Sequence, residues 1–174
     1  GVKLAAEIYI SGLDASIVFF NSTPEFRYRC PDKPVNEQFC VLCAPGNFDD
    51  SKECAGADHV RITHLANPAF WITCPRSDYT AAKAGVQQLQ YEILQQCAPG
   101  LTEHIRFSDT FSPKTILHYT GHLNGAVYGS PDKARTGRTL LENLFVAGTD
   151  QGFLGIIGSL LSGVAIANTQ LLQP

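Results

Sequence analysis

Residues 143–163 of this 174-residue chain read NLFVAGTDQGFLGIIGSLLSG. The run NLFVA (143–147) predicts a short buried strand, and the glycines after it predict a turn into an apolar helix that ends near Leu172. Such a strand–turn–helix directs several backbone N–H groups and the positive end of the helix dipole at one place, which suits a phosphate or another anion. The same glycines also permit tight packing of a helix on a strand, and their spacing is not G-x-G-x-x-G. Spacing alone therefore leaves cofactor contact and simple packing both open.

The predicted helix has two different faces. Its small residues would leave a shallow face, and they are Gly155, Ser159, Ser162 and Gly163. Its large residues are expected to pack inward, and they are Ile157, Leu160, Leu161 and Val164. The most apolar stretch of the chain, residues 153–167, is interrupted by glycines and serines and is shorter than the roughly 20 residues that span a bilayer. The sequence therefore predicts no transmembrane helix.

Upstream of this segment the sequence predicts short strands and one long helix. Apolar alternation or short apolar runs predict strands over residues 3–11, 17–20, 39–44 and 59–64. An apolar stripe at three- and four-residue spacing predicts a helix over residues 78–97. The stripe consists of Tyr79, Ala82, Val86, Leu89 and Ile93.

The segment after this helix is less regular. Residues 105–119 are rich in β-formers but contain Pro113, so they predict an interrupted or edge strand. Residues 121–138 predict a glycine-rich loop. Strands and helices in this order favour an α/β or α+β fold with a mixed sheet and packed helices.

Composition excludes several classes of protein. Apolar residues make up 44% and charged residues 17% of the chain, which predicts a packed core rather than disorder. Thirteen basic against sixteen acidic residues give a formal net charge of −3, so we expect no nucleic-acid partner and no polybasic membrane anchor. The chain begins with Gly1, contains no methionine and shows no signal peptide. From these features we expect a piece of a longer protein in a cytoplasmic or organellar compartment.

The six cysteines are too few for a disulfide scaffold in a domain of this size. Cys40 and Cys43 form a C-x-x-C that Cys30 and Cys54 flank, which leaves a zinc or redox site open against buried, apolar cysteines. On a strand, positions 40 and 43 would point to opposite faces, which favours the buried cysteines. The histidine spacings fit no shared metal, so the sequence predicts no metal site.

Four blocks of sequence follow one another along the last third of the chain. They are SPKT (112–115), YTG (119–121), GAVYG (125–129) and the run 143–163. In this order they resemble the carboxyl-terminal part of the FAD-dependent phytoene desaturase, carotenoid isomerase and retinol saturase-like oxidoreductases. A weaker match is AEIYISGLDA (6–15), which is similar to the strand and turn that re-enters the FAD domain in that family.

The resemblance implies a two-domain FAD-binding oxidoreductase. Residues 1–22 would supply a strand and turn of the FAD-binding domain, residues 23–111 a substrate domain, and residues 112–174 the carboxyl-terminal FAD segment. Tyr119 and Tyr128 would line a tunnel for an apolar substrate, or else pack in an aromatic core. The residues implied to lie beside FAD are Gly148, Thr149, Asp150, Gly152, Phe153, Leu154 and Gly155.

In that family an amino-terminal βαβ unit with G-x-G-x-x-G holds the FAD pyrophosphate, and residues 1–174 contain no such unit. We therefore expect a fragment or subunit of a flavin-dependent oxidoreductase that saturates, desaturates or isomerises C=C bonds of a polyene or isoprenoid. Its FAD site would be incomplete, and the isolated chain would be inactive. Its expected partners are an amino-terminal FAD-domain half, the apolar substrate and a membrane surface for substrate access. The alternative is a non-catalytic module without flavin that binds an apolar ligand or a partner chain.

Overall fold

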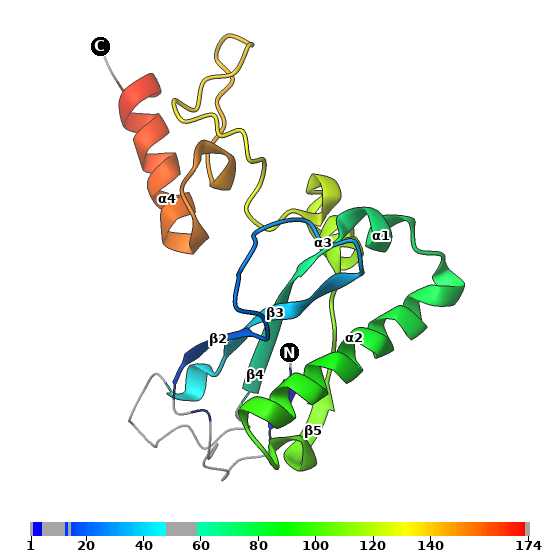
Figure 1. The fold of residues 1–174 in the computed structure, drawn as a ribbon. Coiled ribbons are helices and arrows are strands. Elements are labelled where there is room, and N and C mark those ends of the chain that lie inside the picture. The colour runs from blue at the N-terminus through cyan, green and yellow to red at the C-terminus, as the bar shows by residue number, and fades with distance from the viewer. Residues whose placement is uncertain (1, 5–12, 14, 48–58, 173–174) are drawn as a thin grey trace. The chain divides into compact units, whose positions relative to one another are not determined.

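The structure is a computed structural model, and it describes residues 2–4, 13, 15–47 and 59–172. The chain divides into two compact units, Gly1–Thr115 and Ile116–Pro174, which are described separately below (Figure 1). The first unit contains all of the named strands and the helices α1 and α2. The second unit contains the final helix and the segment quoted at the outset.

A five-stranded sheet forms the centre of the first unit. Its strands are β1 (Val2–Leu4), β2 (Ile17–Asn21), β3 (Val35–Cys43), β4 (His59–Ala66) and β5 (Ile105–Ser108), and their order is β2-β3-β4-β1-β5. Every pairing among the described strands is antiparallel. The fold is therefore α+β, and the expected mixed sheet is replaced by an antiparallel one.

The predicted strands agree with the structure where it describes them. The strands expected over 17–20, 39–44 and 59–64 correspond to β2, β3 and β4. Of the strand expected over 3–11, only residues 3 and 4 are described, and they belong to β1. Strand β3 begins four residues earlier than expected, because Asn36 interrupts its apolar pattern without interrupting the strand.

Two helices pack on this sheet. The short α1 (Pro68–Thr73) begins after Asn67, whose side chain accepts a hydrogen bond from the Phe70 N–H. The long α2 (Arg76–Cys97) confirms the helix expected over 78–97 and begins directly after Pro75. Its Ile93 and Leu94 share one core cluster with residues of β3 and β4, and its Val86 packs in a second cluster with Trp71. The predicted apolar stripe is therefore the face of α2 that packs on the core.

Residues 105–119 contain a strand followed by a helix, rather than the interrupted strand expected from the sequence. Strand β5 ends at Ser108, and α3 (Pro113–Thr120) follows after a short connection. Pro113 is the first residue of that helix, where its missing N–H costs nothing and its fixed φ suits the helix. Ser112 precedes the helix and donates its backbone N–H to the Thr115 hydroxyl over 3.3 Å. This local capping outweighs the β-forming tendency of the residues that follow.

The second unit begins with the end of α3, and turns and one apolar helix follow. The helix α4 (Gly155–Ile166) continues into a wider turn over Ala167–Leu171, which confirms the helix expected to end near Leu172. The strand expected over 143–147 is wrong: these residues form only an isolated bridge between Arg138 and Phe145. An extended apolar segment needs a neighbouring strand for its backbone, and the described part of this unit offers only that single bridge. Residues 121–138 form the expected loop, with a 3₁₀ turn at Leu123–Gly125.

The described residues also form three other short 3₁₀ turns. They lie at Pro45–Asn47, Leu101–His104 and Thr149–Gln151. No helix in the described residues combines the length and apolar character needed to cross a bilayer.

Candidate functional site

The candidate site is the turn that leads into α4. Three of its glycines adopt positive φ angles: +93° at Gly148, +111° at Gly152 and +73° at Gly155. The ψ of Gly148 is −149°, a backbone conformation that is essentially restricted to glycine. A Cβ added to Gly148 or Gly155 would meet no atom within 4 Å. Space for an outside group therefore adjoins the backbone at these two glycines.

Ser162 of α4 fastens this turn to the helix. Its side chain is completely buried, and its Oγ accepts the Gly148 N–H over 2.6 Å. The same hydroxyl donates to Oε1 of Gln151, whose Nε2 donates to the Arg135 carbonyl over 3.2 Å. This chain of hydrogen bonds satisfies buried polar groups that would otherwise destabilise the turn.

The large residues of α4 do not pack inward as expected. The helix turns the small Ser162 and the aliphatic Ile166 inward. Ile157 and Leu160, which were expected to pack inward, are 74% and 67% exposed, and Leu161 and Val164 are exposed as well. The physical reason is the turn itself: the half-buried Gly148 N–H donates to the buried Ser162 hydroxyl, and this hydrogen bond holds the Ser162 side of the helix inward.

Asp150 is held in place by the loop that precedes the turn. Its Oδ1 accepts the Ser130 N–H over 2.7 Å, and its backbone carbonyl accepts the Ala134 N–H over 2.9 Å. A side chain at Gly129 would collide with the Asp150 carboxylate, so the glycine permits the close approach. A carboxylate has about four lone-pair positions, so Asp150 keeps capacity to accept further hydrogen bonds.

Lys133 places a positive charge beside the same turn. Its Nζ donates to the carbonyls of Thr149 and Tyr128, over 3.0 and 2.5 Å. The lysine therefore binds the turn to the loop while its charge stays next to the candidate site.

The amino end of α4 has no side-chain cap. Its first backbone N–H groups therefore lack a side-chain acceptor, and the helix dipole makes this end electropositive. Phe153 and Leu154 precede the helix and are partly exposed. A Cβ on Gly158 would lie 3.2 Å from the Phe153 carbonyl carbon, so this glycine lets the helix pack against the turn.

The structure thus brings the seven residues expected beside FAD into one turn and the start of one helix. The two tyrosines expected to line a substrate tunnel are exposed. Tyr119, in α3, packs its ring edge-on against His118, with centroids 4.8 Å apart. Tyr128 lies in the loop, and its carbonyl contacts Lys133. The roles of Ser162, Gln151 and Lys133 were not predicted from the sequence, although a serine within so apolar a helix is a signal for an inward hydrogen bond.

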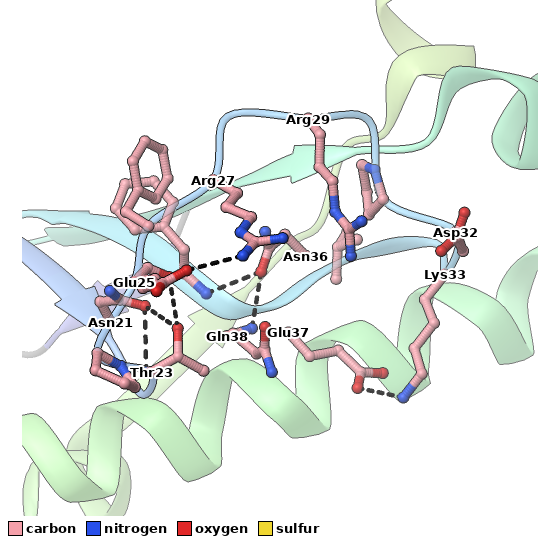
Figure 2. A pocket seen from close by; sticks show the side chains of 15 residues that line it. Asn21, Thr23, Glu25, Arg27, Arg29, Asp32, Lys33, Asn36, Glu37 and Gln38 are labelled. Atoms are coloured by element: carbon pink, nitrogen blue, oxygen red, sulfur yellow. Dashed lines mark hydrogen bonds and ion pairs between the residues drawn. The ribbon is translucent and has the colours of Figure 1, made fainter.

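A separate pocket lies in the first unit, between the segment 22–34 and the start of β3 (Figure 2). Its volume is about 580 Å³, and its charged residues are Glu25, Arg27, Arg29, Asp32, Lys33 and Glu37. Residues 21–36 are polar and interrupted by prolines, a pattern that predicts only a loop. The signal that could have found the pocket is the alternation of Arg27 and Arg29 between prolines.

The cysteines form no metal site in the part of the chain that the structure describes, where no three potential metal ligands come together. Cys40 is buried in the core cluster of the first unit, which confirms the interpretation of this residue as a buried thiol. Burial, with a smaller contribution from nearby Cys97, raises the pKa of Cys40 to about 12. A thiol with so high a pKa is a poor nucleophile at neutral pH. Cys54 lies outside the described residues.

Comparison with known proteins identifies no relative: no family model, no curated protein and no solved structure matches the chain. Any function must therefore be inferred from the residues and geometry described above.

Proposed function

We propose that this chain is the carboxyl-terminal part of an FAD-dependent oxidoreductase that acts on a polyene or isoprenoid-like apolar substrate. The observation that carries the proposal is the turn at residues 148–155. It combines open space beside two glycines, uncapped helix N–H groups and a carboxylate with free acceptor capacity. The sequence resemblance supplies the identity of the cofactor.

These residues fit the chemical groups of FAD. Gly148 and Gly155 would let the cofactor lie against the backbone, because no Cβ intervenes. Asp150 would accept hydrogen bonds from the sugar hydroxyls, and its Ser130 hydrogen bond would fix its orientation. The amino end of α4 would favour negative charge on the flavin ring. Bound flavin would supply hydride exchange with a carbon–carbon bond, and the chain would supply positioning and electrostatics.

The exposed apolar surface of α4 supports the proposal that this chain binds a partner. Five large aliphatic residues on α4 are more than half exposed: Ile156, Ile157, Leu160, Leu161 and Val164. Contiguous apolar surface of this kind marks an interaction site in soluble proteins. The proposed occupant is the amino-terminal half of the FAD domain, which would contribute the βαβ unit and complete the cofactor site.

The same surface favours the second candidate function. A module that binds an apolar ligand or a partner chain without flavin would use the aliphatic stripe of α4 directly. It would not need the glycine-only backbone conformation at residue 148 or the free capacity of Asp150. Flavin binding therefore distinguishes the two functions.

The visible spectrum of the natural gene product, purified in full, tests the main proposal. We expect flavin absorption at near 1:1 stoichiometry. Gly148→Val should lower the flavin content at least about tenfold, because it fills the open space and strains a glycine-only conformation. Gly85→Ala is the matched control, since Gly85 lies inside α2 with open space around it, and it should leave the flavin content unchanged.

A colourless gene product would overturn the flavin proposal and favour the module. Equal flavin content in the Gly148→Val and wild-type proteins would place the cofactor elsewhere. For the 174-residue chain alone, bound flavin at 1:1 would exclude the flavin-free module. Flavin uptake only after the addition of an amino-terminal half would support a divided site.

A further inference from the structure

The pocket of the first unit carries an inference that is independent of flavin binding. Its outer wall is the segment 22–34, and its inner wall is the start of β3 (Figure 2). A volume of about 580 Å³ lies within the range of small-molecule sites.

Only some of the charged side chains of this pocket form ion pairs with one another. Arg27 forms an ion pair with Glu25 at 2.9 Å, and Lys33 forms one with Glu37 at 2.5 Å. Arg29 and Asp32 also line the pocket, and neither belongs to an ion pair among the described residues. Figure 2 shows the Arg29 side chain extending from the loop into the pocket, with Asp32 apart from it at one end. Among the residues that the structure describes, Arg29 forms no ion pair or hydrogen bond. The pocket therefore presents one guanidinium whose hydrogen-bonding capacity is unused.

Two aromatic residues also line this pocket. The rings of Phe26 and Phe39 are in contact, with centroids 4.3 Å apart, and both residues line the pocket. Phe26 is about half exposed, so part of the aromatic surface remains open to a ligand. Val35 and two prolines extend the apolar wall. The pocket thus combines one unpaired guanidinium with an apolar surface.

The loop that carries Arg29 is held at both ends. At its start, the Ser22 N–H donates to the Gln38 carbonyl over 2.9 Å. At its end, the Pro34 carbonyl accepts the Asn67 N–H over 3.0 Å and the Trp71 indole N–H over 2.8 Å. Pro24 and Pro31 restrict the backbone between these anchors. Such preorganisation lowers the entropic cost of ordering the loop around a ligand.

From these observations we propose that the pocket binds an organic carboxylate with an aromatic or aliphatic body. The planar fork of Arg29 would bind the carboxylate through two parallel N–H···O hydrogen bonds, which suits a guanidinium better than an ammonium group. The body of the ligand would pack against Phe26 and Phe39. The Arg27–Glu25 pair would fix the neighbouring guanidinium and leave Arg29 as the primary ligand-binding residue.

Equilibrium dialysis of the chain with 4-phenylbutyrate tests this site, and 4-phenylbutan-1-ol and inorganic phosphate serve as comparison ligands. We expect saturable binding of the carboxylate, with at least about tenfold weaker binding of the neutral alcohol and of phosphate. Arg29→Gln should weaken carboxylate binding about tenfold. Arg106→Gln, which removes an exposed arginine from β5, is the matched control and should change nothing.

Trp71 reports the location of binding. It is the only tryptophan in the chain, and its indole N–H donates a hydrogen bond to the Pro34 carbonyl. The residues on either side of Pro34, Lys33 and Val35, line the pocket. The fluorescence of Trp71 should change in parallel with the dialysis measurement. The proposal is overturned if the carboxylate does not bind, if Arg29→Gln binds it as well as wild type, or if the alcohol binds equally well. Equal binding of phosphate would likewise overturn it, because the aromatic wall would then play no part. These outcomes do not involve flavin, so they are independent of the proposed oxidoreductase function.

Discussion

At the scale of the single residue, His64 shows how burial sets the charge state of a side chain. The residue lies on β4 and is paired with Cys40 of β3 in the sheet. Its Nδ1 lies 2.8 Å from the Asn36 carbonyl. Burial lowers the pKa of His64 below its usual value, and backbone hydrogen bonding with Asn36 and Phe39 opposes this effect only in part. The folded protein therefore favours the neutral imidazole.

This lowered pKa predicts a pH-dependent stability. The unfolded chain, with an ordinary histidine pKa of about 6.5, binds a proton more readily than the folded chain. The contribution of His64 to the free energy of unfolding is therefore fully present above about pH 6.5. It is lost progressively as the pH drops from that value toward the folded-state pKa. Thermal unfolding followed by circular dichroism should show a lower Tm at about pH 5.5 than at about pH 7.5.

His64→Gln should flatten this dependence, because glutamine retains a hydrogen-bond donor and does not titrate. His104→Gln, at an exposed position, should keep the wild-type dependence. If His64→Gln kept the full fall in Tm between these pH values, the dependence would have to come from another group.

At the scale of the element, α4 shows that an apolar helix can have a small, polar inward face. Ser162 is fully buried and Ile166 is 6% exposed, while the large aliphatic residues beside them are exposed. Helix α3 makes a related point, since its Pro113 and Ser112 start a helix within a β-rich sequence. In both elements, local hydrogen bonding decides the outcome that hydrophobic pattern leaves open.

The two faces of α4 should respond differently to truncation. Ile166→Ala removes buried aliphatic volume and should lower the free energy of unfolding of the second unit by about 2–5 kcal/mol. Leu160→Ser changes an exposed position and should alter it by no more than about 0.5 kcal/mol. Urea unfolding followed by circular dichroism measures both. An equal cost for the two substitutions would show that the aliphatic stripe is buried in solution.

At the scale of the whole molecule, the stabilising core is concentrated in the first unit. Strands β3 and β4 each pair on both sides, and the face that they share with α2 contains the main core cluster. Leu42 and Val60 from these strands are completely buried. The second unit, by contrast, relies on turns, on α4 and on the hydrogen bonds of Ser162 and Asp150.

Hydrogen exchange across the chain should reflect this distribution. We expect the amides of β3, β4 and α2 to exchange slowest, because opening them disrupts the core cluster. The edge strands β2 and β5 should exchange faster, and residues 126–147 faster still, since that segment forms no helix and no strand beyond the single Arg138–Phe145 bridge. Mass spectrometry of peptic fragments measures all of these segments in one experiment. Protection of residues 126–147 equal to that of β3 would contradict this picture.

The sequence by itself determined the elements whose signals are local and periodic. The stripe from Tyr79 to Ile93 fixed α2, and short apolar runs located β2, β3 and β4, because these patterns reflect one buried face. It also determined the turn at residues 148–152, since glycine is the residue that adopts its positive φ angles without strain.

Only the tertiary structure decided which surfaces meet. It showed that residues 143–147 lack the partner strand that an apolar run needs, and that Ser162 rather than the large aliphatic residues turns inward. It also placed Arg29 in a pocket formed by a loop and a strand. Each of these outcomes depends on groups far apart in sequence, and their hydrogen bonds and packing produce no periodic pattern of residues in the sequence.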